Sequence, residues 1–216
     1  MPGNSIGSGN GIIVVDDDSA DGTGKIVDRM AQGDSSLRLI RRSGRRGLTT
    51  ALQEGIDRAN GSLIGWLDCD LSMPPETLSL LIRTATTNAD IAMGSRYIPG
   101  GADLRSERLA VILSKIICTL CHFLLHKSVT DYTSGFIVAQ RKVLKQIRLR
   151  GFHGEYFIDL INQAMNSGFT VREIPYQLVS RKKGISKTAP HPFGFVFHGR
   201  KYLATMIQTW WRSRCS

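Results

Sequence analysis

Apolar strands alternate with helical segments through the first half of this chain, and this order limits the fold more than any other feature. Ile12–Val15 is a fully apolar run rich in β-branched residues, which is typical of a strand buried on both faces. Further runs predict strands at 37–41, 62–67 and 89–94, and the segments between them predict helices at 22–31, 48–59 and 72–88. The β-α-β-α-β-α-β order predicts an α/β fold, with a mostly parallel sheet and helices on both faces.

Aspartates follow two of these strands. Asp16–Asp18 come directly after the first strand, where Ser19 or Asp21 can cap the next helix. Asp68 and Asp70 flank a single residue after another strand. Ligands of such sheets bind beyond the carboxyl ends of the strands. Two carboxylates at a strand end can bind Mg²⁺ or Mn²⁺ together with phosphate oxygens, and the alternative for both clusters is a plain solvated turn.

The second half of the chain is less regular. It predicts a long amphipathic helix over 105–126, a strand over 136–139 and a helix over 155–167. Val171–Val179 is an extended segment that contains Pro175, which places it near a sheet edge. An amphipathic helix over 193–211 ends in the run Trp-Trp-Arg-Ser-Arg.

The net charge indicates the kind of binding partner, and the cysteine content indicates the cellular compartment. The formal net charge of +10 favours an anionic partner. A nucleic-acid binder ranks last, because no basic motif interleaved with aromatic residues is present. The four cysteines show no disulfide spacing, no signal peptide is recognised and no apolar run reaches transmembrane length, so we expect a cytoplasmic protein. Residues 1–10 are rich in Gly, Ser and Asn and predict a disordered leader.

Six short motifs, in order, resemble those of one enzyme family. They are V-V-D-D-D-S-A-D-G-T, D-C-D-L-S-M-P-P, G-S-R-Y-I-P-G-G, D-Y-T-S-G-F, G-E-Y-F-I-D-L and R-K-K-G-I-S-K-T. Together they resemble the family 2 glycosyltransferases, in the branch of dolichol-phosphate mannosyltransferases and polyprenyl-phosphate hexose synthases. The resemblance covers about residues 11–205 and implies a GT-A domain, which is a Rossmann-like fold that binds nucleotide sugars.

The resemblance implies a reaction and its substrates. A hexose, typically mannose from GDP-mannose, would move to a polyprenyl or dolichyl phosphate with inversion at the sugar carbon. A bound Mg²⁺ or Mn²⁺ ion would neutralise the diphosphate leaving group. The acceptor phosphate is already anionic, so the reaction needs positioning and charge neutralisation more than a strong base.

The resemblance also implies roles for particular residues. Asp16 and Asp17 would contact the nucleoside, while Asp68 and Asp70 would hold the metal and the donor diphosphate, with Ser72 beside them. On the acceptor side, the implied contacts are Arg96 with the phosphate, Ser134 near it, and Arg181 and Lys187 in a basic flap. Asp70, Arg96 and Arg181 are therefore the predicted catalytic residues.

Plainer interpretations stand beside several of these roles. Arg96 taken alone is an ordinary surface arginine, and Asp131, Thr133 and Ser134 form a tight turn before a strand. Glu155 and Asp159 lie four residues apart, which is typical of a solvated helix face, and the family match places them on the acceptor side instead. A zinc site at Cys118, Cys121, His122 and His126 is disfavoured, because these side chains do not converge on one continuous helix.

A lipid acceptor implies contact with a membrane. We expect the helix over 105–126 and the segment 193–216 to lie at a membrane surface on its cytoplasmic face, with a membrane subunit as a further possible partner. The first strand of the family and its P-x-Y-N-E turn are not recognised before Ile12, so the sequence predicts an N-terminally truncated domain with a gap or exposed edge in its sheet. The alternative function is an impaired homologue that binds a membrane or a protein partner.

Overall fold

The computed structural model describes residues 11–44, 47–180 and 192–215, and the predicted leader at 1–10 lies outside this part. The first half contains β1 (Ile12–Asp16), α1 (Thr23–Gly33), β2 (Leu37–Arg41), α2 (Leu48–Arg58), β3 (Leu63–Trp66), α3 (Pro75–Thr87) and β4 (Ile91–Ser95). The second half contains β5 (Ala102–Leu104), α4 (Arg108–Leu124), β6 (Ile137–Gln140), α5 (Arg141–Gln146), α6 (Tyr156–Asn166), β7 (Val171–Pro175), β8 (Gln177–Val179) and α7 (Pro192–Cys215). The predicted alternation of strands and helices is confirmed. Each predicted boundary lies within three residues of the observed one, except the end of the last helix, which lies at Cys215 instead of 211.

The strands form three sheets. β1 pairs with β2, β5 pairs with β8, and a four-stranded sheet has the order β3-β6-β4-β7. Three of the five strand pairs are parallel, but β6 runs antiparallel to both of its neighbours, β3 and β4. Within the described residues, β1 has β2 as its sole strand neighbour and β3 has β6. The α/β class is therefore confirmed, with a sheet that is divided rather than continuous.

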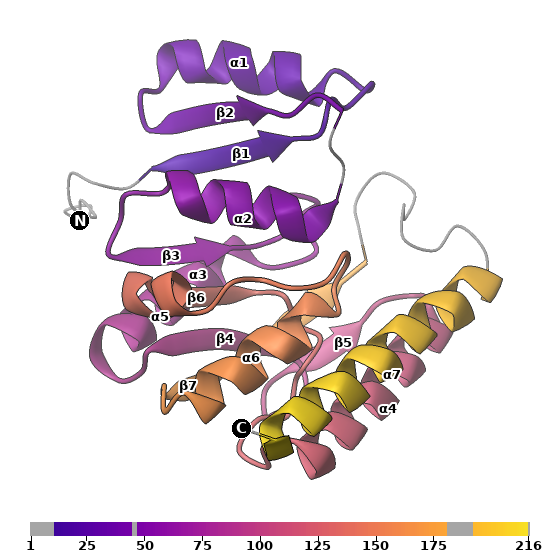
Figure 1. Ribbon diagram of the computed structural model, residues 1–216. Coiled ribbons are helices and arrows are strands. Elements are labelled where there is room, and N and C mark those ends of the chain that lie inside the picture. Colours follow the sequence, from indigo (N-terminus) through magenta and orange to yellow (C-terminus); the bar gives the residue numbers. More distant parts are fainter. Residues whose placement is uncertain (1–10, 45–46, 181–191, 216) are drawn as a thin grey trace.

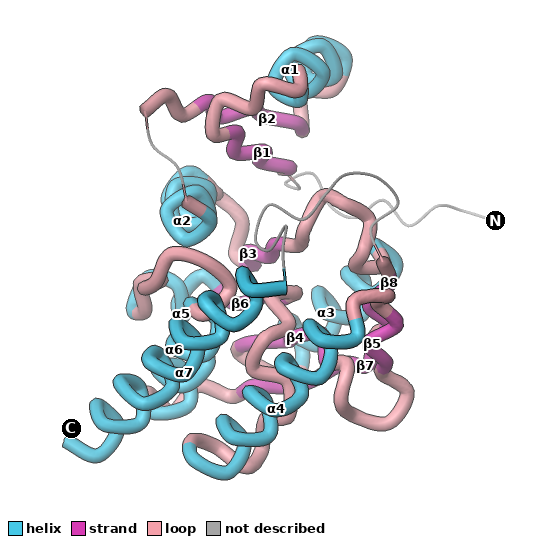
Figure 2. The backbone as a smooth tube through the Cα atoms, turned by 90° about the vertical axis from the view of Figure 1, so that its right-hand side faces the viewer, coloured by secondary structure: helices cyan, strands magenta, loops and turns pink. Residues whose placement is uncertain are grey.

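Helices cover both sides of the strands. Figure 2 shows the strands stacked in a column, with α2, α5 and α6 on one side and α3 on the other. Two clusters of buried side chains fill these layers. The larger cluster lies below α6 and includes Ile91, Ile137 and Phe157, while the smaller one lies below α3 and includes Leu81 and Phe136. Strands β3, β4 and β6 are thereby held in place by apolar contact on both faces.

The turn before α1 differs from the predicted cap. Gly22 occupies the N-cap position at φ 84°, in the left-handed region that glycine adopts without strain. Neither Ser19 nor Asp21 is the N-cap residue, so that part of the prediction is wrong, although Asp21 still satisfies the first amide of the helix. The carboxylate of Asp21 accepts hydrogen bonds from the amide and hydroxyl of Thr23, at 3.0 and 2.6 Å.

The extended segment 171–179 is divided at Tyr176. β7 pairs with β4, and β8 turns away to pair with β5 in a separate small sheet. Pro175 lies on an edge strand, as predicted, because β7 has no second strand neighbour within the described residues. The short elements β5 and α5 were not predicted, since segments of three and six residues are too short to carry a periodic signal.

The longest helices, α4 and α7, lie side by side along one flank of the molecule (Figure 1). Across the described residues, no helix combines the length and the apolar character needed to cross a bilayer.

Candidate functional site

The loop Asp68–Ser72 follows β3 and carries the paired carboxylates. Asp68 is exposed and Asp70 is partly exposed, while Ser72 is buried. The Asp70 Oδ1 atom accepts hydrogen bonds from the Ser72 amide at 3.0 Å and from the Ser72 hydroxyl at 2.6 Å. These two bonds fix the orientation of the Asp70 carboxylate at the end of the strand.

The chain leaves β8 directly beside this loop. The Val179 amide donates to the Ser72 carbonyl oxygen at 3.1 Å. The Ser180 hydroxyl accepts from the Ser106 amide at 2.9 Å. The predicted flap residues Arg181 and Lys187 come next in the chain and lie outside the described residues. The last described residue before them is therefore held near the paired carboxylates.

Backbone strain is found at both acidic strand ends. Within the described residues, the non-glycine residues with positive φ are Asp18, at 59°, and Leu71, at 61°. Asp18 follows β1 and Leu71 follows Asp70. Such conformations are uncommon for bulky residues and persist where surrounding contacts impose them, which is frequent at functional sites. No residue pattern in the sequence indicates this strain.

Asp16 and Asp17 at the end of β1 have different surroundings. Asp16 is buried, and its carboxylate accepts a hydrogen bond from the Ser19 amide at 3.2 Å. The Asp17 carboxylate binds Arg42 at 2.6 and 2.8 Å and also accepts from the Gly47 amide at 3.0 Å. Arg42 is buried, so this ion pair ties the end of β1 to the end of β2. The sequence did not indicate this partner for Asp17.

Tyr156 is a part of the site that the sequence analysis missed. Its hydroxyl accepts a hydrogen bond from the Trp66 indole at 2.8 Å. Burial raises the pKa of Tyr156, and the negative charge of Asp68 raises it further. Trp66 is the last residue of β3, so α6 is joined to the strand that ends in the paired carboxylates.

Arg96 is buried, which contradicts the interpretation of an ordinary surface arginine. Its side chain is 2% exposed. The guanidinium donates to both carboxylate oxygens of Asp131, at 2.7 and 2.8 Å, and to Asp103 at 3.0 Å. Burial alone lowers the pKa of an arginine, but the Asp131 carboxylate raises the pKa of Arg96 above its ordinary value. A contact between Arg96 and an acceptor phosphate stays a prediction, which this geometry does not favour.

The turn at Asp131–Ser134 has two functions in the fold. Asp131 accepts a hydrogen bond from the Thr133 amide at 3.1 Å, so the predicted tight turn is present. The same carboxylate, which is 0% exposed, is the main partner of Arg96. Ser134 is buried, and its hydroxyl donates to the Tyr176 hydroxyl at 3.4 Å. An acceptor contact for Ser134 stays a prediction.

Glu155 and Asp159 do not lie on a solvated face, so that interpretation is wrong. Both are 3% exposed. Glu155 accepts from the amides of Phe152 and His153 at 3.0 and 3.1 Å. Asp159 accepts from Gln163 at 2.6 Å and from Thr209 of α7 at 3.3 Å. Burial raises the pKa of Asp159. Glu155 therefore contacts the loop before α6 and Asp159 contacts α7, and neither side chain faces solvent.

The paired carboxylates fit a hard divalent cation that takes its other ligands from elsewhere. Within residues 11–44, 47–180 and 192–215, no three or more His, Cys, Asp or Glu side chains are arranged so that they could hold a metal ion by themselves. This also applies to Cys118 and Cys121 and the histidines near them. Mg²⁺ is commonly bound by one or two carboxylates together with phosphates and water. Asp68 and Asp70 therefore suit such an ion when a phosphorylated ligand supplies the remaining oxygens.

Comparison with known sequences identifies relatives over most of the chain. The sequence profile described as "Glycosyl transferase family 2" matches residues 9–148. The chain is 37% identical over 183 residues to a polyprenol monophosphomannose synthase of Mycolicibacterium smegmatis, which covers 82% of this chain and 69% of the relative. It is 30% identical over 178 residues to a dolichol-phosphate mannosyltransferase of Pyrococcus furiosus, of which it spans half.

Comparison with solved structures shows that the fold of this chain is that of GT-A glycosyltransferases. A crystal structure of glucosyl-3-phosphoglycerate synthase from Mycobacterium tuberculosis, in complex with Mn²⁺, UDP and glucosyl-3-phosphoglycerate, is similar with a TM-score of 0.66. The two chains are 17% identical, and the similarity covers 92% of this chain and 68% of the other.

Proposed function

Since this chain belongs to glycosyl transferase family 2 and has the GT-A fold, we propose that it transfers a mannosyl group from a nucleotide sugar to a polyprenyl phosphate. Two relatives are named for mannosyl transfer to polyprenol or dolichol phosphate, and this supports the proposal. The structural observation that carries it is the loop Asp68–Ser72, whose carboxylates lie at a strand end beside the end of β8. GDP-mannose is the proposed donor.

The donor would be held by the acidic strand ends. In this proposal Asp68 and Asp70 hold Mg²⁺ or Mn²⁺, which neutralises charge on the departing diphosphate when bound. Ser72 keeps the Asp70 carboxylate oriented through its two hydrogen bonds. Asp16 is proposed to contact the nucleoside. Asp17 would contribute to nucleoside binding indirectly, because its ion pair with Arg42 holds the turn after β1 in place.

The acceptor would approach from the side of β4, β8 and α4. An oxygen of the acceptor phosphate attacks the sugar carbon as the bond from that carbon to the diphosphate breaks, so the configuration at that carbon inverts. The nucleophile is an anion, and no side chain has to remove a proton from it. Arg181 and Lys187 are proposed to close over the phosphates. The buried residues Arg96 and Ser134 are proposed to position the turn Asp131–Ser134, which would face the acceptor.

Transfer of labelled mannose tests the proposed function. Purified protein is incubated with GDP-mannose and dolichyl phosphate in detergent, with and without Mn²⁺, and labelled lipid is extracted and counted. We expect labelling that depends on the metal. If folded protein labels no lipid from GDP-mannose, UDP-glucose or UDP-N-acetylglucosamine, the proposed activity is contradicted and the impaired homologue is favoured.

A lipid acceptor calls for a membrane-facing surface, and we propose that α4 and α7 form it. Five apolar residues of α4 recur at helical spacing and are 38–66% exposed, namely Leu109, Ile112, Ile116, Leu120 and Phe123. On α7, which packs beside α4, Leu203, Ile207 and Trp211 are 40–65% exposed. Lys115 lies within this face, and Arg212 and Arg214 follow Trp211. Apolar stripes with nearby cations are typical of helices that lie at a lipid surface.

Replacing apolar residues of this face should weaken binding to lipid vesicles. Ile112 and Phe123 are 55% and 66% exposed, and burial of such side chains contributes about 1.5–3 kcal/mol each. We therefore expect the double variant Ile112→Ser/Phe123→Ser to bind anionic vesicles at least about tenfold more weakly in a sedimentation assay. A matched control is Met30→Ser/Leu80→Ser, which changes side chains that are 58% and 53% exposed on α1 and α3. Equal binding by both double variants would exclude the α4–α7 face.

A further inference from the structure

The outer edge of β2 has main-chain groups that no described strand covers. The Ser36 carbonyl accepts from the Ile12 amide at 2.8 Å, and the Arg42 amide donates to the Asp16 carbonyl at 2.9 Å, so both residues face β1. Alternate residues of a strand direct their N–H and C=O groups to opposite sides. Leu39 and Arg41 therefore direct theirs outward, where β2 has no strand neighbour within the described residues, although α1 packs against β2.

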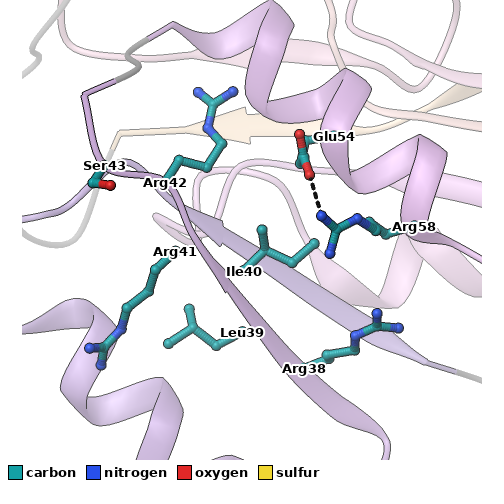
Figure 3. A pocket seen from close by; sticks show the side chains of 8 residues that line it. All are labelled: Arg38, Leu39, Ile40, Arg41, Arg42, Ser43, Glu54 and Arg58. Carbon is teal, nitrogen blue, oxygen red and sulfur yellow. Dashed lines mark ion pairs between the residues drawn. The ribbon is translucent and has the colours of Figure 1, made fainter.

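A pocket of about 440 Å³ opens along this edge and is rich in arginine. Figure 3 shows side chains of β2 and α2 around it, and the lining residues are Arg38, Leu39, Ile40, Arg41, Arg42, Ser43, Glu54 and Arg58. Four guanidinium groups thus face one carboxylate in the lining. Asp17 and Asp28 pair with Arg42 and Arg41 from outside the lining. Among the described residues, the lining charge that stays unpaired is therefore that of Arg38, and a positive charge at this strand edge favours an anionic partner.

The arginines of the pocket differ in how firmly they are held. Arg42 is buried against Asp17 and belongs to the fold. Arg41 binds Asp28 at 2.7 Å, but both side chains are more than half exposed, and such surface pairs are weak. Arg58 pairs with Glu54 of its own helix at 2.9 Å. Arg38 is exposed and has no ion-pair partner among the described residues. Arg38 and Arg41 are therefore the cations most available to a ligand.

From this edge and its charge, we propose that β2 binds an acidic segment of another protein in extended conformation, as an added strand. The segment would pair with the outward N–H and C=O groups of Leu39 and Arg41. Arg38 and Arg41 lie on opposite faces of β2, so the carboxylates on one face of the segment would meet Arg38 and those on its other face would meet Arg41. A small phosphate would leave the two carbonyl groups without donors. A second copy of this chain, paired through the same edge, would bring its own Arg38 and Arg41 against these cations.

The test uses a fluorescein-labelled peptide of alternating valine and glutamate, eight residues long, and measures fluorescence anisotropy. We expect saturable binding to the wild-type protein and a loss of about tenfold or more in affinity for Arg38→Glu, because the variant places a carboxylate against the carboxylates of the peptide. The matched control is Arg83→Glu, which reverses an exposed charge on α3 and should bind like the wild type. Equal weakening by both variants would overturn the proposed location.

A second peptide separates strand pairing from charge alone. Alternating proline and glutamate has the same charge, but it lacks the amide donor at every second residue, and the proline rings hold φ away from the values of a paired strand. We expect it to bind at least about tenfold more weakly, and we expect only the valine peptide to slow amide hydrogen exchange at Leu39 and Arg41. Equal affinity for both peptides, or complete displacement by millimolar pyrophosphate without any change in exchange, would overturn strand addition and indicate a simple anion site.

Discussion

Replacing Asp70 by alanine is expected to lower mannosyl transfer by about 10³-fold, because charge neutralisation at a departing diphosphate contributes several kcal/mol. The change removes one of two carboxylates in the loop after β3 and the acceptor of two hydrogen bonds from Ser72. Each such bond contributes about 1 kcal/mol, so the fold should persist with a modestly lower melting temperature. Transfer rates and circular dichroism melting curves measure the two effects.

Two controls make this result specific. Ser72→Ala keeps both carboxylates and removes the hydroxyl bond to Asp70, so we expect a smaller loss of transfer than in Asp70→Ala. Asp57→Ala removes a carboxylate from the exposed side of α2, where it binds Gln53, and should leave transfer unchanged. If Asp70→Ala retains transfer with the same dependence on Mn²⁺, the assignment of the metal site is wrong.

Replacing Arg96 by methionine is expected to lower the free energy of unfolding by about 3–5 kcal/mol, because it leaves buried carboxylates without their cation. Asp131 is fully buried and would lose both side-chain bonds from the guanidinium. Asp103 would keep Arg105, which binds it at 2.7 Å from a more exposed position. Denaturant unfolding of the wild type and the variant measures the loss.

A double-mutant cycle shows whether the loss belongs to the pair. Arg96→Met combined with Asp131→Leu removes both charges, so the combined loss should be smaller than the sum of the single losses. Arg105→Met is the control with a partly exposed arginine and should cost about 1 kcal/mol or less. An unchanged stability of Arg96→Met, together with a raised KM for dolichyl phosphate, would favour the predicted phosphate contact over the structural role.

Much of the fold was predictable from short stretches of sequence. Strand β1 is a run of apolar, mostly β-branched residues, and Pro75 begins α3 where proline at the first helical position is favoured. These signals are local, because they depend on residues within one or two turns of each other. The acidic ends of β1 and β3 were predictable for the same reason, since a carboxylate after an apolar run marks the end of a strand.

The partners of the buried charges were not predictable in this way. Arg96 and Asp131 are separated by 35 residues, and Asp17 and Arg42 by 25. Nothing in the neighbouring residues of Arg96 distinguishes a surface arginine from one that is enclosed by two carboxylates. The division of the sheets was likewise unpredictable, because β6 enters antiparallel between β3 and β4 from a distant part of the chain.

The sequence by itself determined the strands, the helices and the two acidic strand ends, because these depend on side-chain size, periodicity and backbone preference over a few residues. The tertiary structure alone decided which charges are buried, which strand edge stays open and which apolar residues of α4 and α7 face outward. Each of these properties depends on what lies opposite a side chain or a main-chain group. The group that lies opposite depends on contacts between segments that are far apart in the chain.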